Sequence, residues 1–195
     1  RRIYPFEFKE IWDIGAHKGE TTTYFRSKFV KSKIRSFEPI AENFRILHER
    51  CANTTNHDSY QLALGDEVKT VKIHLQNASV IHSLRPDLNV PSSSNPKTEE
   101  VNQTTVDLLF DKFNCSKIDV LKIDVEGYEK SMFKNTKQTT WDKIQKMFIE
   151  YHEDTSLSLD EYPYNVHDFL KISIFELTTF IINDPSIGVC NCFSS

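Results

Sequence analysis

The first 64 residues alternate between short apolar runs and segments long enough for a helix, and this alternation restricts the fold more than any other feature. Strands are predicted at 11–14, 34–37 and 60–64, each ended by a glycine or an acidic residue. Helices are predicted between them at 21–30 and 41–51, the first capped by Thr21 or Thr22. This order is typical of a parallel sheet with right-handed crossovers, so we predict an α/β protein.

The rest of the chain is predicted to extend this sheet and to end it with a reversed pair of strands. We expect an antiparallel edge strand at 68–76, a long and mobile polar loop at 85–100, helices at 104–113, 128–133 and 165–171, and buried strands at 120–123 and 146–151. The last strands, 175–182 and 187–192, are joined by a turn too short for a parallel crossover and must form an antiparallel hairpin. The prediction is one domain over 1–195, with a doubly wound, mostly parallel sheet of seven strands and a C-terminal antiparallel hairpin.

Composition argues against two broad classes of protein. The 24 basic and 28 acidic residues give a net charge of −4, and no cluster of Lys and Arg is present to neutralise phosphates, so we expect no nucleic-acid partner. No apolar run reaches the roughly 18 residues that a membrane span needs. The four cysteines are too scattered for a disulfide framework. We expect a soluble domain, in the cytoplasm rather than a secretory lumen, and the sequence leaves its oligomeric state open.

The turn after the first predicted strand suits a ligand without phosphate groups. Gly15 and Gly19 flank His17, which stands where a dinucleotide-binding fingerprint requires a glycine to admit the pyrophosphate. Gly15 allows a sharp turn and a close approach of backbone to ligand, and Gly19 allows the next helix to pack near the strand. S-adenosylmethionine (SAM) has no phosphate, and its aminocarboxylate would lie against this turn and the start of the helix. The residues predicted to contact the cofactor here are Asp13, Gly15, Ala16, His17, Gly19, Thr21 and Thr22.

Residues suited to the rest of a nucleoside follow the second and third predicted strands. Glu38, next to Pro39, can accept hydrogen bonds from both hydroxyls of a ribose. After the third strand, Leu64 can pack on an adenine ring, Gly65 makes a turn and Asp66 can accept the exocyclic amine. Ligands of doubly wound sheets bind beyond the carboxyl ends of the strands, so we predict that these residues share one cofactor site.

The densest acidic segment follows the predicted strand at 120–123. Asp124 and Glu126 lie at the mouth of a strand that should be covered on both faces, where an unpaired charge is costly, so we expect them to meet a partner or a ligand. His152 follows the strand at 146–151 and is a candidate general base beside that mouth. The predicted catalytic residues are therefore His152, Asp124 and Glu126, and Asp124 is also predicted to contact the cofactor.

Taken together, these segments resemble a known family. The sequences WDIGAHKGETT at 12–22, FEP at 37–39, ALGD at 63–66, LKIDVEGYE at 121–129 and IEYH at 149–152 occur in this order and resemble the FkbM family of SAM-dependent methyltransferases, over about 11–179. The resemblance implies the class I methyltransferase fold and transfer of a methyl group from SAM, typically to a hydroxyl oxygen of a sugar, a polyketide or another small metabolite. It also implies a cofactor site lined by Asp13, Gly15, Gly19, Glu38, Asp66 and Asp124.

The expected activity is therefore O-methylation of a hydroxyl on a glycan or small metabolite, by in-line transfer with help from a general base. No metal ion is predicted to take part. Three alternatives stay open. The first is a divalent-metal-assisted O-methyltransferase that gathers Asp124, Glu126 and either Glu150 or His152 around the ion. The second is a nicotinamide oxidoreductase, disfavoured by His17 and by the reversed hairpin. The third is a methyltransferase-like scaffold that binds or assembles without catalysis.

Overall fold

The computed structural model of the chain describes residues 7–75, 82–83, 97–126, 128–149 and 169–171. Within them, six strands form one sheet in the order β10-β9-β8-β1-β2-β3, and every pairing is parallel. The strands are β1 (Glu10–Ile14), β2 (Lys33–Phe37), β3 (His57–Tyr60), β8 (Val120–Ile123), β9 (Met147–Ile149) and β10 (Phe169–Lys171). From β1 the chain adds strands first on one side and later, from β8, on the other. The carboxyl ends of β1 and β8 are thus the switch point at which such sheets bind ligands.

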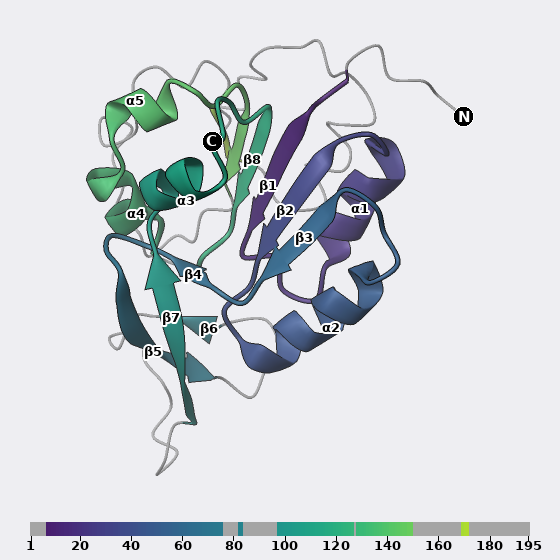
Figure 1. Cartoon of the computed structure of the whole chain (residues 1–195). Helices are drawn as coiled ribbons and strands as arrows, with labels where there is room; N and C mark the ends of the chain where they lie inside the picture. Colours follow the sequence, from purple (N-terminus) through teal and green to yellow (C-terminus); the bar gives the residue numbers. More distant parts are fainter. Residues whose placement is uncertain (1–6, 76–81, 84–96, 127, 150–168, 172–195) are drawn as a thin grey trace, which may run out of the picture.

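Helices cover both faces of this sheet, which makes it doubly wound. Figure 1 shows α1 (Glu20–Lys28) and α2 (Ala41–Cys51) on one side, and α3 (Val106–Lys112), α4 (Glu129–Asn135) and α5 (Gln138–Trp141) on the other. The largest core cluster lies under α3, α4 and α5 and contains Trp12, Phe37, Phe110 and Trp141. The predicted α/β fold with a mostly parallel sheet is confirmed.

A second, smaller sheet is inserted between β3 and α3. It consists of β4 (Ala63–Leu64), β5 (Lys69–Leu75), β6 (His82–Ser83) and β7 (Thr98–Thr104), in the order β4-β7-β5-β6. β5 is antiparallel to both β7 and β6, whereas β4 is parallel to β7. In Figure 1 this sheet lies at the lower left, beyond the carboxyl ends of β1 and β2.

Several predicted boundaries were wrong. The third strand of the main sheet is 57–60 and not 60–64, because 63–64 leaves that sheet to pair with β7. The strand predicted at 68–76 belongs to the second sheet and is paired on both sides, so it is not an edge strand of the main sheet. Residues 98–100, predicted as loop, are the first part of β7, and Thr104 ends that strand, so α3 begins only at Val106.

Two further predictions concern the C-terminal part. Residues 169–171, predicted as the end of a helix, form β10, which pairs in parallel with β9. Residues 85–96 of the predicted loop, and the hairpin at 175–182 and 187–192, lie outside the described residues. The total of seven strands and the reversed hairpin therefore stay predictions. None of the described helices is long and apolar enough to cross a membrane.

Candidate functional site

Three polar side chains lie in a row on the face of the sheet that packs against α1. Strand register places Ser36 of β2 beside Asp13 of β1, and Asp13 beside Lys122 of β8. All three are buried, as is Thr22 of α1, whose hydroxyl donates to Asp13 Oδ2 over 2.6 Å and lies 2.8 Å from Ser36 Oγ. Buried polar groups need such partners, because each unsatisfied one costs about 1–3 kcal/mol. Thr22 therefore ties α1 to the sheet, and the predicted cap was wrong: the N-cap residue of α1 is Gly19, without a side-chain hydrogen bond.

Lys122 stands at the centre of the predicted site, and the sequence interpretation gave it no role. Its ammonium donates to the carbonyl oxygen of Gly15 over 2.7 Å and to Asp124 Oδ2 over 3.3 Å, and lies 3.5 Å from Asp13 Oδ1. The side chain is only 4% exposed. The sequence did carry a signal for this contact. A lysine within the apolar strand Val-Leu-Lys-Ile must find internal acceptors if the strand is covered on both faces.

The turn after β1 has its shape because of two glycines. The N–H groups of Gly15 and Ala16 both donate to the carbonyl oxygen of Phe37, each over 3.0 Å, which closes the turn against the end of β2. Gly15 has a φ of 73°, and a Cβ there would overlap the carbonyl oxygen of Asp124. The close approach that this glycine allows is thus to the end of β8. Gly19, with a φ of 88°, similarly packs against Leu47 of α2 rather than against the strand.

Glu38 closes the other side of this turn. Its carboxylate accepts hydrogen bonds from the backbone N–H groups of His17 and Ile40, each over 2.9 Å, and at 3.5 Å from the side-chain amide of Asn43. The residue is 4% exposed. Burial raises the pKa of Glu38 to about 7, although the three N–H donors and the Lys122 ammonium act to lower it. The carboxyl group therefore changes its charge near neutral pH.

Asp124 and His17 bring unpaired polar atoms to this edge. The backbone N–H of Asp124 donates to the Ile14 carbonyl oxygen over 3.0 Å, which places the side chain beside the turn. Asp124 Oδ1 and His17 Nε2 are buried and have no hydrogen-bond partner among the described residues. Because such atoms are costly to leave unpaired, they are available to a ligand. Glu126 follows two residues later, half-buried in a left-handed conformation with a φ of 50°.

The residues predicted for the adenine side hold the second sheet against α4. Leu64 packs in the core with Ile14, Phe37 and Ile123, which immediately precede Gly15, Glu38 and Asp124, so it lies at the same edge of the sheet. Gly65 donates its N–H to Thr104 and packs against the side chain of Gln103. Asp66 accepts hydrogen bonds from Gln103 over 2.9 Å, Tyr128 over 3.2 Å and Ser131 over 3.1 Å, and pairs with Lys69 over 3.0 Å.

The structure thus brings most of the predicted residues to the carboxyl edge of the sheet, in two linked groups. Direct contacts around Lys122, Phe37 and Glu38 join Asp13, Gly15, Ala16, His17, Thr22, Glu38 and Asp124. Leu64, Gly65 and Asp66 lie on the α4 side, Thr21 is buried in the first turn of α1, and Pro39 is half-buried beside Glu38. His152 and Glu150 lie outside the described residues. Besides Lys122, the sequence interpretation missed Ser36, Asn43, Gln103, Tyr128 and Ser131.

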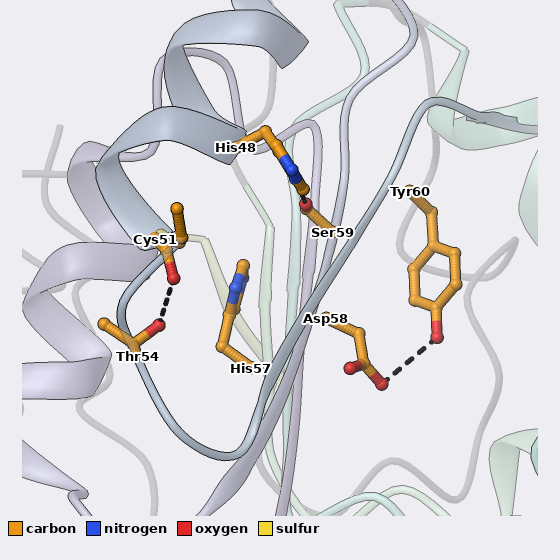
Figure 2. A pocket seen from close by; sticks show the side chains of 8 residues that line it. His48, Cys51, Thr54, His57, Asp58, Ser59 and Tyr60 are labelled. Carbon is orange, nitrogen blue, oxygen red and sulfur yellow. Dashed lines mark hydrogen bonds between the residues drawn. The ribbon is translucent and has the colours of Figure 1, made fainter.

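Two surface hollows lie away from this edge. One, of about 320 Å³, is lined by residues of α2, β3 and the loop between them (Figure 2). Its His57 is 3.1 Å from Ser36 Oγ and so extends the buried polar row, and burial lowers the pKa of this imidazole to about 4. The other, of about 610 Å³, lies at the amino ends of β1 and β2 around Glu10, Arg35 and Lys117. The predicted site residues line neither hollow.

Comparisons with known proteins show the family to which the chain belongs. Residues 13–175 match the methyltransferase FkbM domain, so the chain belongs to the FkbM methyltransferase family, and the resemblance drawn from the sequence motifs is confirmed. The chain is 25% identical over 157 residues to Methyltransferase 1 of Beauveria bassiana (strain ARSEF 2860), a match that covers 72% of this chain and 63% of the relative. It is also similar to the crystal structure of methyltransferase FkbM from Methylobacillus flagellatus KT, with a TM-score of 0.48 and 16% identity, covering 73% of this chain and 34% of that one. The chain thus spans less than two thirds of the length of either relative.

Proposed function

We propose that this chain is a SAM-dependent methyltransferase that methylates a hydroxyl oxygen of a glycan or a small metabolite. The observation that carries the proposal is the meeting of the Gly15 turn, Glu38 and Asp124 at the switch point of a doubly wound sheet. The described side chains suit a cationic nucleoside. Asp13 and Asp124 bring two negative charges against the single positive charge of Lys122, which leaves one negative charge beside the turn.

The residues that would hold the cofactor follow from this arrangement. The turn at 15–19 and the start of α1 would receive the aminocarboxylate, and Asp124 Oδ1 is an acceptor for a donor group of the ligand. Glu38 would accept from the ribose through Oε2, which receives only the His17 N–H and keeps a lone pair, whereas Oε1 already accepts from Ile40 and Asn43. Leu64, Gly65 and Asp66 would lie on the adenine side. When bound, SAM supplies a methyl group that is already activated by the sulfonium charge.

The protein's own contribution to the chemistry would be a base that removes the proton of the acceptor hydroxyl. Such a base commonly contributes about 10²–10⁴-fold to the rate. Asp124, Glu126 and His152 are the candidates. His152→Ala is expected to lower turnover and leave SAM affinity nearly intact, because this residue is proposed to contact the acceptor only. Unchanged turnover would remove His152 from the mechanism.

Ligand binding separates this function from its alternatives. Calorimetric titration of the purified chain is expected to show binding of SAM and of its demethylated product, and no binding of NADH, because His17 occupies the place of the glycine that a pyrophosphate requires. NADH binding without SAM binding would favour an oxidoreductase, and binding of neither would favour a scaffold. Methylation that stops after exhaustive chelation would favour the metal-assisted alternative, for which Asp124 and Glu126 are the described candidates.

A further inference from the structure

We propose that Lys122 is a positioning residue of the donor site: its ammonium fixes the Gly15 turn against the end of β8 and sets the charge that the ligand meets. The inference rests on the proposed function. Side-chain contacts of Lys122 join β1 to β8. Its Nζ reaches the carbonyl oxygen of Gly15 in the turn, Oδ1 of Asp13 in β1 and Oδ2 of Asp124 after β8.

The three contacts determine what the lysine can do. An ammonium has three N–H donors, and three oxygens of the described residues lie within 3.5 Å of it while the side chain is 4% exposed. A group held in this way presents no lone pair toward an acceptor hydroxyl, so Lys122 is not a candidate for the general base. Instead it holds other groups in place. By binding Asp124 through Oδ2 alone, it leaves Oδ1, which has no hydrogen-bond partner among the described residues, available to a ligand.

The same contacts bear on the charge of the site. Without the ammonium, the buried carboxylate of Asp13 in β1 and the half-buried carboxylate of Asp124 directly after β8 would lose the cation with which both pair among the described residues. The ammonium also acts on Glu38, where it lowers the pKa of the carboxyl group against the effect of burial. The other groups that bear on Glu38 are the backbone N–H groups of His17 and Ile40 and the amide of Asn43. Lys122 thus acts on three carboxylates of the edge, those of Asp13, Glu38 and Asp124.

The test compares Lys122→Met with Lys33→Met, using two readouts. Lys33 is a matched control because it also lies on a strand and pairs with a carboxylate, Asp58, over 2.8 Å, but at the amino end of β2. The first readout is the calorimetric affinity for SAM. Lys122→Met is expected to weaken it by about tenfold or more, by analogy with the loss of residues that orient metal ligands. Lys33→Met is expected to leave it unchanged.

The second readout needs no ligand, so it separates this inference from the proposed function. The carboxyl carbon of Glu38, identified in labelled protein by its loss in Glu38→Gln, is titrated by NMR. Its midpoint is expected to rise in Lys122→Met and to stay at the wild-type value in Lys33→Met. Wild-type protein that does not bind SAM refutes the proposed function. An unchanged Glu38 midpoint in Lys122→Met overturns the inference that Lys122 sets the charge of the site.

The positioning role has its own decisive outcome. If wild-type protein binds SAM and Lys122→Met binds it equally well, the role is refuted. Lys122→Arg keeps the proposal testable if the methionine variant does not fold. Its planar guanidinium keeps the charge but cannot occupy the place of a compact ammonium among three oxygens. SAM affinity should then fall while the Glu38 midpoint stays near that of the wild type, and an unchanged affinity would again refute the positioning role.

Discussion

At the scale of single residues, Glu38 shows how burial and hydrogen bonding compete. Transfer from water favours the neutral acid, whereas the N–H donors of His17, Ile40 and Asn43 favour the carboxylate. Burial is the larger effect and raises the pKa of Glu38 to about 7. Between about pH 4.5 and 7 the folded protein therefore binds a proton here that the unfolded chain has already released.

Glu38→Gln should remove a fall in stability across this pH range. Because the folded pKa lies above the unfolded value of 4.5, the wild-type unfolding free energy should decrease as pH rises from about 5 to 7 and be level above that. The full effect is roughly 3 kcal/mol, at about 1.4 kcal/mol per unit of pKa. Urea denaturation at pH 5 to 8 measures it. Glu42→Gln, at an exposed carboxylate of α2, is the control and should keep the wild-type slope. Equal slopes for wild type and Glu38→Gln would contradict the prediction.

The candidate site shows which residues a sequence can reveal. Gly15 and Asp124 stand directly after apolar runs and Glu38 follows the predicted strand at 34–37, so the end of each strand marked them. Lys122 lies inside an apolar run, which indicates that it needs internal acceptors, but the structure is required to show that these acceptors lie at the same edge. Ser36 and Asn43 are ordinary polar residues in sequence and become partners only when β2 and α2 are packed.

At the scale of elements, the sequence predicted the central strands and missed peripheral ones, for a physical reason. β1 and β8 are covered on both faces and read as apolar runs. β3 has the sequence His-Asp-Ser-Tyr and is only half-buried along its length, because it is the edge of the main sheet. In β7 only Val101 and Gln103 are buried, so its alternation is too weak to identify a strand. β10 has three residues and is defined by its pairing with β9, which sequence periodicity does not report.

Asp66 joins β5, β7 and α4 through its contacts with Lys69, Gln103 and Ser131, and Asp66→Asn should weaken the packing of these elements. Burial would raise the pKa of its carboxyl group, but hydrogen bonds from Lys69, Ser131 and Gln103 outweigh burial and lower the pKa to about 2. The stabilisation is therefore fully present above about pH 4 and is lost as pH falls toward 2. At pH 7 the variant should lose about 1–3 kcal/mol of unfolding free energy, because one of the two acceptor oxygens is replaced by an amide NH2 that faces donors that are at least half-buried.

Urea denaturation between pH 3 and 7 tests this prediction. The difference between wild type and Asp66→Asn should shrink as the pH is lowered. Glu67→Gln is a matched control, since the neighbouring carboxylate also pairs with Lys69, over 2.9 Å, but is exposed, and such pairs contribute less than about 1 kcal/mol. A difference that does not change with pH would contradict the stabilising role of the Asp66 carboxylate. The SAM affinity of Asp66→Asn separately tests the proposed contact with adenine.

At the scale of the whole molecule, the two sheets have unequal cores. The main sheet lies between helices and buries large side chains on both faces, such as Trp12 and Phe25. The second sheet gathers a small cluster of Ile40, Ala63, Ile73 and Val101, and most of β5 is only half-buried while three of the seven residues of β7 are exposed. The stability of the domain should therefore be concentrated in the parallel sheet.

Hydrogen exchange should show the difference in stability between the two sheets and should also locate the bound ligand. Amides of β1 and β8 are expected to be the slowest to exchange, and those of β5 and β7 much faster. Saturating SAM should slow exchange at 15–19, 37–40 and 122–126 by more than it does in β5. Mass spectrometry of labelled peptides, with and without SAM, measures both effects. Uniform slowing in both sheets would indicate global stabilisation alone, and would contradict binding at the carboxyl edge.

The pairing of Lys69 with Gln103 gives the second sheet a further property. These residues stand at the beginning of β5 and near the end of β7, so the segment between them begins and ends at neighbouring points of the structure. A segment whose two ends are held together in this way is suited to exchange between proteins, because its replacement does not require the flanking chain to move. Chimeras that graft the corresponding segment of a relative between 69 and 103 should therefore keep donor binding, and they offer a direct way to ask whether this part of the chain selects the acceptor.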